Sequence, residues 1–196
     1  MEIELRSSAL ILIDIQVGIV GMLPHSEQVK VLANLGRAIS AARNAHVPVM
    51  HVTVGYRPGY PEVSARNTLV SRTKNAGRLL EKNPDAKICP EIEVRSEDIV
   101  VTKRRTSAFF GTDLEIILRT AEIDTLILAG VSTLVSVEST VRDAFDRDFR
   151  LIVLGDCCSD ADVGAHEVAL ITILPRASTV CTTDELIAAL QKGSRM

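Results

Sequence analysis

Short apolar runs alternate with longer stretches of helical spacing from one end of the chain to the other. The apolar runs are rich in valine and isoleucine, have the length of β-strands, and cover residues 9–13, 47–54, 99–101, 125–129, 151–154 and 179–181. They are continuously apolar rather than alternating, which is typical of parallel strands buried on both faces. The pattern therefore predicts an α/β fold, a three-layer α/β/α sandwich around a mainly parallel sheet of about six strands.

Between these runs, apolar residues recur with helical spacing over residues 29–39, 114–121, 135–146, 163–173 and 185–190. Two capping boxes support the starts of two helices, because Thr112 is followed by Glu115 and Thr182 by Glu185 at the required spacing. We expect the helices to cover both faces of the sheet.

One segment interrupts this alternation. The sequence "GYRPGYP" at 55–61 is rich in turn-forming residues, and a long polar passage follows it to about residue 87. In a compact α/β domain such a passage is usually a lid or an oligomer contact. No repeat, linker or low-complexity tract is visible, so we expect a single domain over residues 1–196.

Composition and charge narrow the classes of function. The net charge of −3 gives no electrostatic reason to expect binding to nucleic acid or to an anionic membrane, and the absence of tryptophan argues against base stacking. The apolar runs are too short to cross a membrane, and the first residues lack a signal-peptide pattern. Four cysteines show no disulfide framework. We therefore expect a cytoplasmic protein with reduced thiols.

Three chemically useful side chains follow predicted strands. Asp14 comes after the first strand, Lys103 after the third, and Ser136 lies in the polar elbow after the fourth. Ligands of open parallel sheets bind outside the carboxyl ends of the strands, so these residues are candidates for one site. An acid, a lysine and a hydroxyl form a set of the kind that nucleophilic catalysis uses.

Each of these residues also has a structural explanation. An aspartate at a strand end is often a turn former, Lys103 belongs to the charge run "KRR", and Ser136 fits the first turn of a helix. The histidines lack metal-ligand spacing, and no dinucleotide or phosphate-binding glycine motif follows the first strand. The sequence therefore predicts no metal and no cofactor, and the three candidates gain weight only when they are taken together.

Three blocks in order carry a resemblance to a known family: "ALILIDIQ", "VVTKRRTSAFFGTDLEIILR" and "IDTLILAGVSTLVSVESTVRDAFDRDFRLIVLGDCC". Over nearly its whole length the chain resembles the isochorismatase-like hydrolases, also called the cysteine hydrolase family. The resemblance implies the Rossmann-like fold of that family and a catalytic triad of Asp, Lys and Cys. The Asp falls on Asp14 and the Lys on Lys103, whereas the elbow G-V-x-T-x-x-C-V places Ser136 at the position of the cysteine.

The resemblance implies further features of the site. It implies a cis peptide between Val131 and Ser132, and backbone N–H groups around Val131, Ser132 and Thr133 that face a developing oxyanion. By position we expect contacts with the substrate from Gln16, Arg57, Phe109 and Phe110. Related nicotinamidases have an Asp/His metal site that has no counterpart here, and family members commonly form dimers or tetramers. We therefore expect a metal-free homodimer or homotetramer that acts on a small molecule.

The serine at position 136 leaves three interpretations open, because a hydroxyl ionises far less readily than a thiol and needs a well-placed base. In the first, no nucleophile is needed: as in family members that hydrolyse isochorismate, Asp14 is a general acid that protonates a vinyl ether before water adds. Lys103, the elbow amides and Arg57 then bind the substrate's carboxylates.

In the second interpretation, Ser136 replaces the cysteine of an amidase and disarms it, for instance to trap a complex. In the third, the protein binds a small molecule without turnover. We favour the first, as a small-molecule hydrolase.

Overall fold

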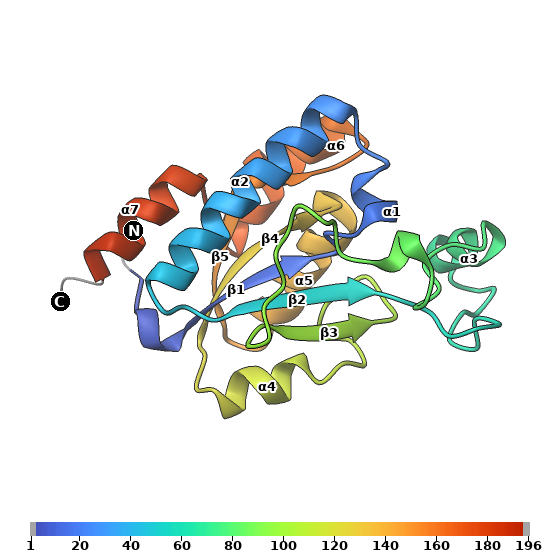
Figure 1. Ribbon diagram of the computed structural model, residues 1–196, viewed down its shortest axis with the longest axis horizontal. Coiled ribbons are helices and arrows are strands. Elements are labelled where there is room, and N and C mark those ends of the chain that lie inside the picture. Colours follow the sequence, from blue (N-terminus) through green and yellow to red (C-terminus); the bar gives the residue numbers. More distant parts are fainter. Residues whose placement is uncertain (1–2, 194–196) are drawn as a thin grey trace.

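Six parallel strands form one sheet in the computed structural model, which describes residues 3–193 (Figure 1). The strands are β1 (Ser8–Ile13), β2 (Val49–Val54), β3 (Ile99–Lys103), β4 (Thr125–Val131), β5 (Arg150–Ser159) and β6 (Thr179–Cys181). Their order is β3-β2-β1-β4-β5-β6, and every neighbouring pair is parallel. The predicted α/β fold is confirmed. The ends of the predicted domain, residues 1–2 and 194–196, lie outside the described residues.

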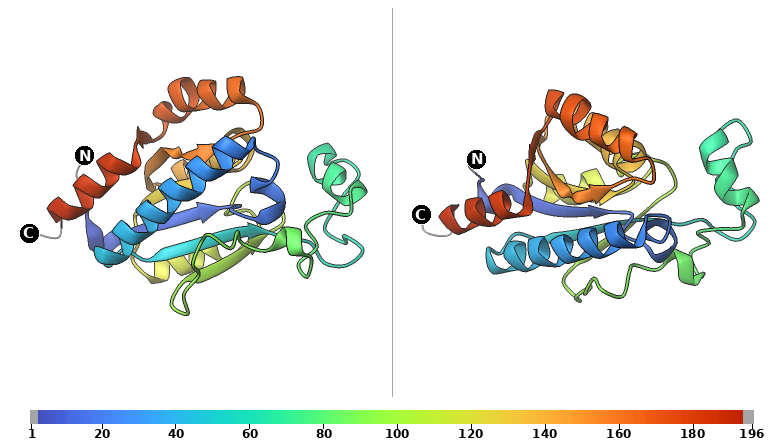
Figure 2. Two further views of the ribbon diagram at one scale, coloured as in Figure 1. Left: turned by 45° about the horizontal axis from the view of Figure 1, so that its top comes forward. Right: turned by 90° about the horizontal axis from the view of Figure 1, so that it is seen from above.

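Helices cover both faces of the sheet (Figures 1 and 2). The α-helices are α1 (Val17–Val20), α2 (His25–Asn44), α3 (Thr68–Asn75), α4 (Leu114–Thr120), α5 (Glu138–Phe145), α6 (Val163–Val168) and α7 (Thr183–Gly193). Short 3₁₀ turns are η1 (Leu5–Ser7), η2 (Pro84–Ala86) and η5 (Leu174–Arg176), and π-helical turns are η3 (Thr133–Val137) and η4 (Ala169–Ile173). The long helix α2 and the C-terminal helix α7 share one face, and α4 and α5 lie on the other.

Strand β1 shows why the apolar runs are continuous. Leu10 and Leu12 pack into the core on the α2 and α7 side, whereas Ile11 and Ile13 pack into the core on the α4 and α5 side. Successive side chains of a strand point to opposite faces, so a strand with two covered faces has no position that faces solvent. All six residues of β1 are buried, and the sheet lies between two apolar cores.

The last strands and helices differ from the sequence prediction in their lengths. The predicted strand 151–154 continues to Ser159, because β5 pairs with β4 again after a register shift and brings Cys158 opposite Gly130. The predicted helix 135–146 begins as the π-helical turn η3 before α5. Both irregularities lie at the carboxyl end of β4, where the site is expected. π-Helical turns are frequent at functional sites.

Only one of the two predicted capping boxes forms. At α7, the amide of Thr182 donates to the Glu185 carboxylate at 2.8 Å, and the amide of Glu185 donates to the Thr182 hydroxyl at 3.3 Å. At α4, the Glu115 carboxylate binds Arg147 at 2.8 Å instead of turning back to the start of its own helix. The capping box predicted at Thr112 is therefore wrong, because a tertiary ion pair takes its acceptor.

The polar passage after β2 contains the helix α3, which the sequence pattern did not predict. Asn67 begins α3, because its side chain accepts a hydrogen bond from the amide of Val70 at 3.2 Å. The helix stands beyond the carboxyl end of β2, outside the three layers (Figure 2). At its base, the Tyr60 hydroxyl donates to the carbonyl of Arg78 at 2.9 Å. The insertion is thus an ordered arm over the carboxyl edge of the sheet.

Candidate active site

Asp14, Lys103 and Ser136 meet in one cluster, which we call the active-site network. The Lys103 ammonium lies 2.7 Å from Oδ2 of Asp14. The Ser136 hydroxyl donates to the same Oδ2 at 2.6 Å and accepts a hydrogen bond from the Lys103 Nζ at 3.2 Å. The structure therefore brings together all three side chains that the sequence singled out.

The strand order explains this meeting. Strands β1 and β4 are neighbours at the centre of the sheet, where the direction of winding reverses, so Asp14 and the elbow containing Ser136 flank one crevice. Ligand sites of open α/β sheets lie at such switch points. Strand β3 is separated from β1 by β2, and Lys103 lies in register with Val54 of β2. The lysine side chain must therefore cross the end of β2 to reach Asp14.

The backbone of β1 and β4 fixes the two sides of this crevice. Gly130 lies opposite Ile13 in the sheet, and a Cβ at position 130 would collide with the Ile13 carbonyl and lie 2.9 Å from its Cβ. Only glycine allows the two strands to come this close. Asp14 follows with a positive φ of 56°, a conformation that aspartate tolerates better than most residues. The peptide between Val131 and Ser132 is cis.

The carboxyl group of Asp14 is 2 % exposed and has two unlike oxygens. Oδ2 accepts from both Lys103 and Ser136, whereas Oδ1 is buried and has no hydrogen-bond partner within residues 3–193. Burial raises the pKa of Asp14 above its ordinary value, against the opposing effect of the Lys103 charge and the hydrogen bonds that the carboxylate accepts. The shift is in the direction of the protonated form, and Oδ1 is the oxygen that accepts no hydrogen bond within residues 3–193.

Lys103 is held in place by all of its donors. It is 1 % exposed, and besides Asp14 and Ser136 its ammonium contacts the carbonyl of Thr106 at 2.7 Å. A lysine ammonium has three N–H donors, so these three contacts use each of them. The expectation that Lys103 belongs to a solvated charge run does not apply, since its side chain lies in the interior.

The elbow uses several of its own amides. The amides of Ser136 and Val137 donate to the carbonyl of Ser132 at 3.0 and 3.1 Å, and the amide of Val135 donates to the Ser132 hydroxyl at 3.2 Å. The Thr133 hydroxyl is hydrogen-bonded to Nδ1 of His166 at 2.9 Å, which ties the elbow to α6. An oxyanion bound here would have to accept a hydrogen bond from the Ser136 amide, which already donates to the Ser132 carbonyl, or from the amides at the beginning of the elbow.

A cavity of about 450 Å³ lies above the active-site network. It is lined by Asp14, Ile19, Met22, Val54, Tyr56, Asn67, Leu69, Val70, Arg72, Thr73, Ala76, Arg78, Leu79, Lys103, Arg105, Thr106, Val131, Ser132, Val135 and Ser136. Its floor is the network, and its outer wall is α3. Four of the lining side chains are cationic and only Asp14 is acidic, so the cavity is suited to an anionic small molecule.

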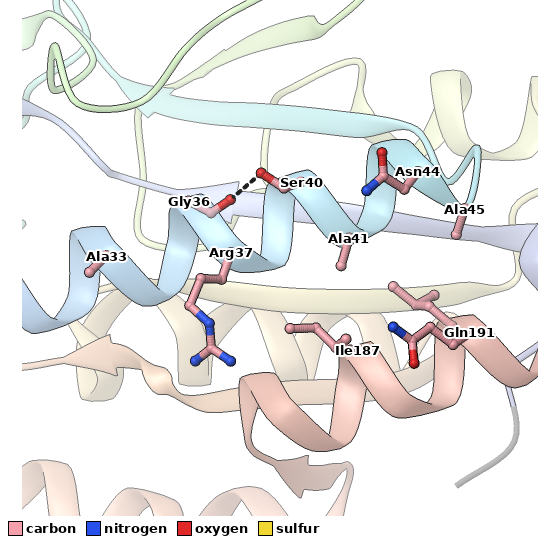
Figure 3. Close-up of a pocket in the computed structure, with 10 residues that line it drawn as sticks. Ala33, Gly36, Arg37, Ser40, Ala41, Asn44, Ala45, Ile187 and Gln191 are labelled. Atoms are coloured by element: carbon pink, nitrogen blue, oxygen red, sulfur yellow. Dashed lines mark hydrogen bonds between the residues drawn. The ribbon is translucent and has the colours of Figure 1, made fainter.

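A second hollow, of about 830 Å³, lies between α2 and α7 (Figure 3). Small side chains line most of it, and Ser40 donates to the carbonyl of Gly36 within its own helix at 2.8 Å. Its one ionisable lining residue, Arg37, is paired with Asp184. The larger hollow therefore contains no reactive group, and the chemistry belongs to the smaller one.

Two predicted substrate contacts, Gln16 and Arg57, are wrong for this cavity. The Gln16 amide is fully used inside the protein, because it donates to the carbonyls of Val54 and Ala86 at 2.8 and 2.6 Å and accepts from the Val54 amide. It joins β1 to β2 instead of facing a ligand. The side chain of Arg57 is 62 % exposed and pairs with Glu62 at 2.8 Å, outside the lining of the cavity.

The two phenylalanines do not wall the cavity either. Phe109 is buried in the core on the α4 and α5 side, with its ring centroid 5.7 Å from that of Phe149. Phe110 is 63 % exposed. Neither lines the cavity of a single chain, because the segment after Lys103 turns toward α4 instead of back over the carboxyl edge of the sheet. Thr133 is also absent from the lining, whereas Val131 and Ser132 are present.

The functional residues that sequence reasoning missed are the arginines of the lining, Arg72, Arg78 and Arg105. The sequence pattern of the polar passage after residue 61 could have pointed to Arg72. Leu69, Arg72, Thr73 and Ala76 have the i, i+3, i+4, i+7 spacing of one helix face, which marks a single side of α3.

The cysteines lie outside the site. All four are free and buried, and burial raises the pKa of Cys157 to about 12 and those of Cys89 and Cys181 to about 11. None of them lies in the elbow, where the resemblance places the cysteine of the family. Among residues 3–193, no three His, Cys, Asp or Glu side chains are grouped so that they could hold a metal ion. Within that part of the chain, no helix has both the length and the apolarity needed to cross a membrane.

A doubly wound parallel sheet with an Asp–Lys–hydroxyl network at its switch point defines a class of α/β hydrolase. Residues 8–185 match the isochorismatase domain family, and the chain belongs to this family of hydrolases.

Individual relatives agree with this assignment. The chain is 32 % identical to the uncharacterized isochorismatase family protein YecD of Escherichia coli, over 97 % of this chain and 100 % of that one. It is 33 % identical to the ureidoacrylate amidohydrolase RutB of Methylobacterium radiotolerans, over 73 % of this chain and 60 % of that one. Among solved structures, a cysteine hydrolase from Pseudomonas syringae pv. phaseolicola is similar with a TM-score of 0.89 and 25 % identity, covering 98 % of this chain and 96 % of that one.

Proposed function

We propose that the protein hydrolyses a small carboxylate-bearing molecule of the isochorismate type, with Asp14 as the general acid. The observation that carries this proposal is the carboxyl group of Asp14. It is buried, has a raised pKa, belongs to the lining of the cavity, and has one oxygen, Oδ1, without a hydrogen-bond partner among residues 3–193. General acids in hydrolytic enzymes commonly acquire a raised pKa through burial in this way.

In the proposed reaction, the proton on Oδ1 of Asp14 is transferred to the terminal carbon of a vinyl ether, which forms a C–H bond and an oxocarbenium ion. Water adds to the cationic carbon and gives its proton back to the Asp14 carboxylate. The resulting hemiketal then breaks its bond to the leaving oxygen, and the proton of its hydroxyl group passes to that oxygen, which yields a ketone and an alcohol. Lys103 and Ser136 hold Oδ2 throughout, so that the proton is exchanged at Oδ1 alone.

The cationic lining of the cavity supports an anionic substrate in this proposal. Lys103, Arg72, Arg78 and Arg105 surround a single acidic group, and the remaining lining is largely apolar. A carboxylate would be attracted to such a surface, and the apolar walls suit the carbon skeleton of a small metabolite.

A second candidate is amide hydrolysis with Ser136 as the nucleophile. Ser136 stands where the family has its cysteine, donates to Asp14 at 2.6 Å, and the relatives include enzymes named for amide hydrolysis. In that mechanism Asp14 must be ionised so that it can accept the hydroxyl proton. The raised pKa of Asp14 opposes this role, so we rank it second. A binder without turnover ranks third, because the active-site network is fully assembled.

The test measures turnover of isochorismate and ureidoacrylate by the protein and by the variants Asp14→Asn and Ser136→Ala. We expect hydrolysis of isochorismate, a decrease in kcat of about 10²- to 10⁴-fold in Asp14→Asn, and a decrease below about tenfold in Ser136→Ala. Unchanged isochorismate hydrolysis in Asp14→Asn would falsify the acid mechanism.

The variant Ser136→Cys separates the two candidates. If it gains ureidoacrylate hydrolysis that the original protein lacks, the site is an amidase whose nucleophile has been disarmed. If neither the original protein nor Ser136→Cys hydrolyses the amide, while the original protein hydrolyses isochorismate, the acid mechanism is supported.

Family membership also supports a homodimer or homotetramer as part of this proposal. Light scattering of the purified protein after size-exclusion chromatography tests it, and a monomer at micromolar concentration would contradict it.

A further inference from the structure

Helix α3 presents a single face to the cavity. Leu69, Val70, Arg72, Thr73 and Ala76 line the cavity from this helix. Residues three and four apart lie on the same side of a helix, so these side chains form one continuous wall. Figure 2 shows helix α3 apart from the sheet, and residues of α3 and of the active-site network line the same cavity, so a ligand in it could contact both.

The arginines near the cavity differ in what balances their charge. Arg57 and Arg104 both pair with Glu62, at 2.8 and 3.4 Å, and Arg104 also pairs with Glu81. Their charges are therefore neutralised by carboxylates of the same insertion. Neither residue lines the cavity.

The arginines that do line the cavity have less compensation. Arg105 donates to the carbonyls of Arg104 and Glu62 at 2.7 and 3.0 Å, and Arg78 donates to the carbonyl of Gly18. The carbonyl contacts of Arg105 occupy its donors without neutralising its charge, whereas Arg78 also forms a long ion pair with Asp85, at 4.0 Å. Both guanidinium groups are fixed in the wall, and Arg105 contributes positive potential.

Arg72 is the exception among them. Its guanidinium has no ion pair and no hydrogen bond with any side chain or carbonyl within the described part of the chain. A guanidinium offers five donors in a planar fork, the geometry that matches a carboxylate. On the wall opposite Asp14, these donors remain available to a ligand.

We infer that Arg72 is the residue that selects anionic substrates, by binding a carboxylate at the mouth of the cavity while Asp14 reacts with the other end of the molecule at its floor. The substrate class is then a small molecule with a terminal carboxylate, an apolar middle and a hydrolysable group. The inference deepens the proposed function and rests on it for the identity of the reacting end. The binding of the carboxylate itself does not depend on turnover.

The test uses benzoate and its neutral counterpart benzamide as probes, titrated into the full chain by isothermal calorimetry. We expect benzoate to bind more tightly than benzamide. We expect Arg72→Gln to weaken benzoate binding by about 5- to 20-fold, as the loss of a charge-assisted hydrogen bond at a partly exposed site should. Benzamide binding should stay unchanged, and Arg72→Lys should retain part of the affinity for benzoate.

Lys74→Gln is the matched control, because Lys74 is exposed on the same helix, carries the same charge, and does not line the cavity. Equal weakening by Lys74→Gln and Arg72→Gln would overturn the inference, since the effect would then be one of net charge. Benzoate binding no tighter than benzamide binding, or undetectable at about 10 mM, would overturn it too.

The failure of the two proposals can be distinguished with Asp14→Asn. If Asp14→Asn loses turnover and Arg72→Gln weakens benzoate binding, both the acid mechanism and the inference about Arg72 are supported. If Asp14→Asn keeps its turnover and Arg72→Gln weakens benzoate binding, only the acid mechanism is contradicted. If Arg72→Gln binds benzoate as tightly as the original protein, only the inference about Arg72 is contradicted.

Discussion

Two aspartates with buried side chains stand at opposite ends of the same sheet. Asp14 belongs to the active-site network at the carboxyl end of β1, and Asp98 lies immediately before β3, where it contacts Arg43 and His51. We call Arg43, His51 and Asp98 the strand-start network. The Asp14 and Asp98 side chains have similar exposed fractions, 3 % and 4 %, yet Asp14 as a whole residue is buried, whereas Asp98 is half-buried near the surface. Burial therefore accounts for part of the difference between them.

Hydrogen bonding also distinguishes them. Oδ2 of Asp98 accepts from the Arg43 guanidinium at 2.7 Å and from the Arg95 amide at 2.9 Å, and it lies 3.4 Å from the His51 ring. Burial by itself would raise the pKa of Asp98, but these hydrogen bonds and the Arg43 charge lower it overall. At Asp14 burial prevails and the pKa is raised.

The contrast suggests how the same residue type can be structural in one place and, in the proposed mechanism, reactive in another. A buried carboxylate with enough donors is stable as an anion and joins its neighbours. A buried carboxylate with one oxygen that accepts no hydrogen bond is less stable as an anion, so its pKa is raised and its protonated form can donate the proton to a ligand. Hence Asp98 should matter for stability, and Asp14 for turnover.

The largest effect on stability is expected from Asp98→Ala. This change removes one acceptor of the Arg43 guanidinium, which keeps its contacts with Glu93, and it removes the acceptor of the Arg95 amide. The free energy of unfolding should therefore fall by about 2 kcal/mol. Urea denaturation followed by circular dichroism measures it, and the exposed neighbour Glu97→Ala is the control, with almost no change. Equal losses in the two variants would show that the strand-start network is not structural.

The effect of Asp98→Ala also has a defined pH dependence. The pKa of Asp98 is lowered in the folded protein, so its stabilising effect is fully present above the ordinary value of 3.8 and is lost as the pH falls through the lower folded value. The two unfolding curves should therefore converge only in strong acid. Convergence near neutral pH would contradict the assigned shift.

The next prediction concerns the alkaline limb of the pH–rate profile. If protonated Asp14 is the reactive form, kcat/KM for isochorismate should fall as the pH rises through the raised pKa of Asp14. The Lys103 charge lowers that pKa, so Lys103→Met should move the fall to higher pH, whatever it does to the maximal rate. A pH–rate profile that rises instead of falling would indicate that ionised Asp14 acts as a base.

The smallest effect is expected from His51→Gln. The contact of His51 with Asp98 is the longest in the strand-start network, at 3.4 Å, and Asp98 keeps its other donors when it is lost. The free energy of unfolding should fall by about 1 kcal/mol. Chemical denaturation at pH 7 tests it, and a loss as large as that of Asp98→Ala would mean that His51 is the principal partner of Asp98.

Much of the fold and the active-site network was predictable from local pattern. The strands were visible because both faces of the sheet are covered, and Asp14, Lys103 and Ser136 could be proposed because parallel strands deliver their following residues to one edge. The resemblance to the family then supplied the roles of these residues. Their distances, and the unpartnered Oδ1 of Asp14, required the structure.

The walls of the cavity were not predictable in the same way. Arg57 was chosen because it follows β2 directly, yet the chain continues outward and an arginine of α3 occupies the wall. The path of that insertion depends on contacts between distant segments, such as the donation from Arg78 to the carbonyl of Gly18. Phe109 was misplaced for a related reason, because it packs against Phe149 in a core that adjacency to Lys103 does not reveal.

The close approach of Gly130 to Ile13 has a consequence for how this site can change over evolution. Main-chain packing between two central strands, and not the side chain at 136, sets where the elbow stands. A thiol or a hydroxyl can therefore occupy the same point in space, and a single codon change exchanges one chemistry for another without disturbing the scaffold. Diversity of reactions within such a lineage needs no new architecture.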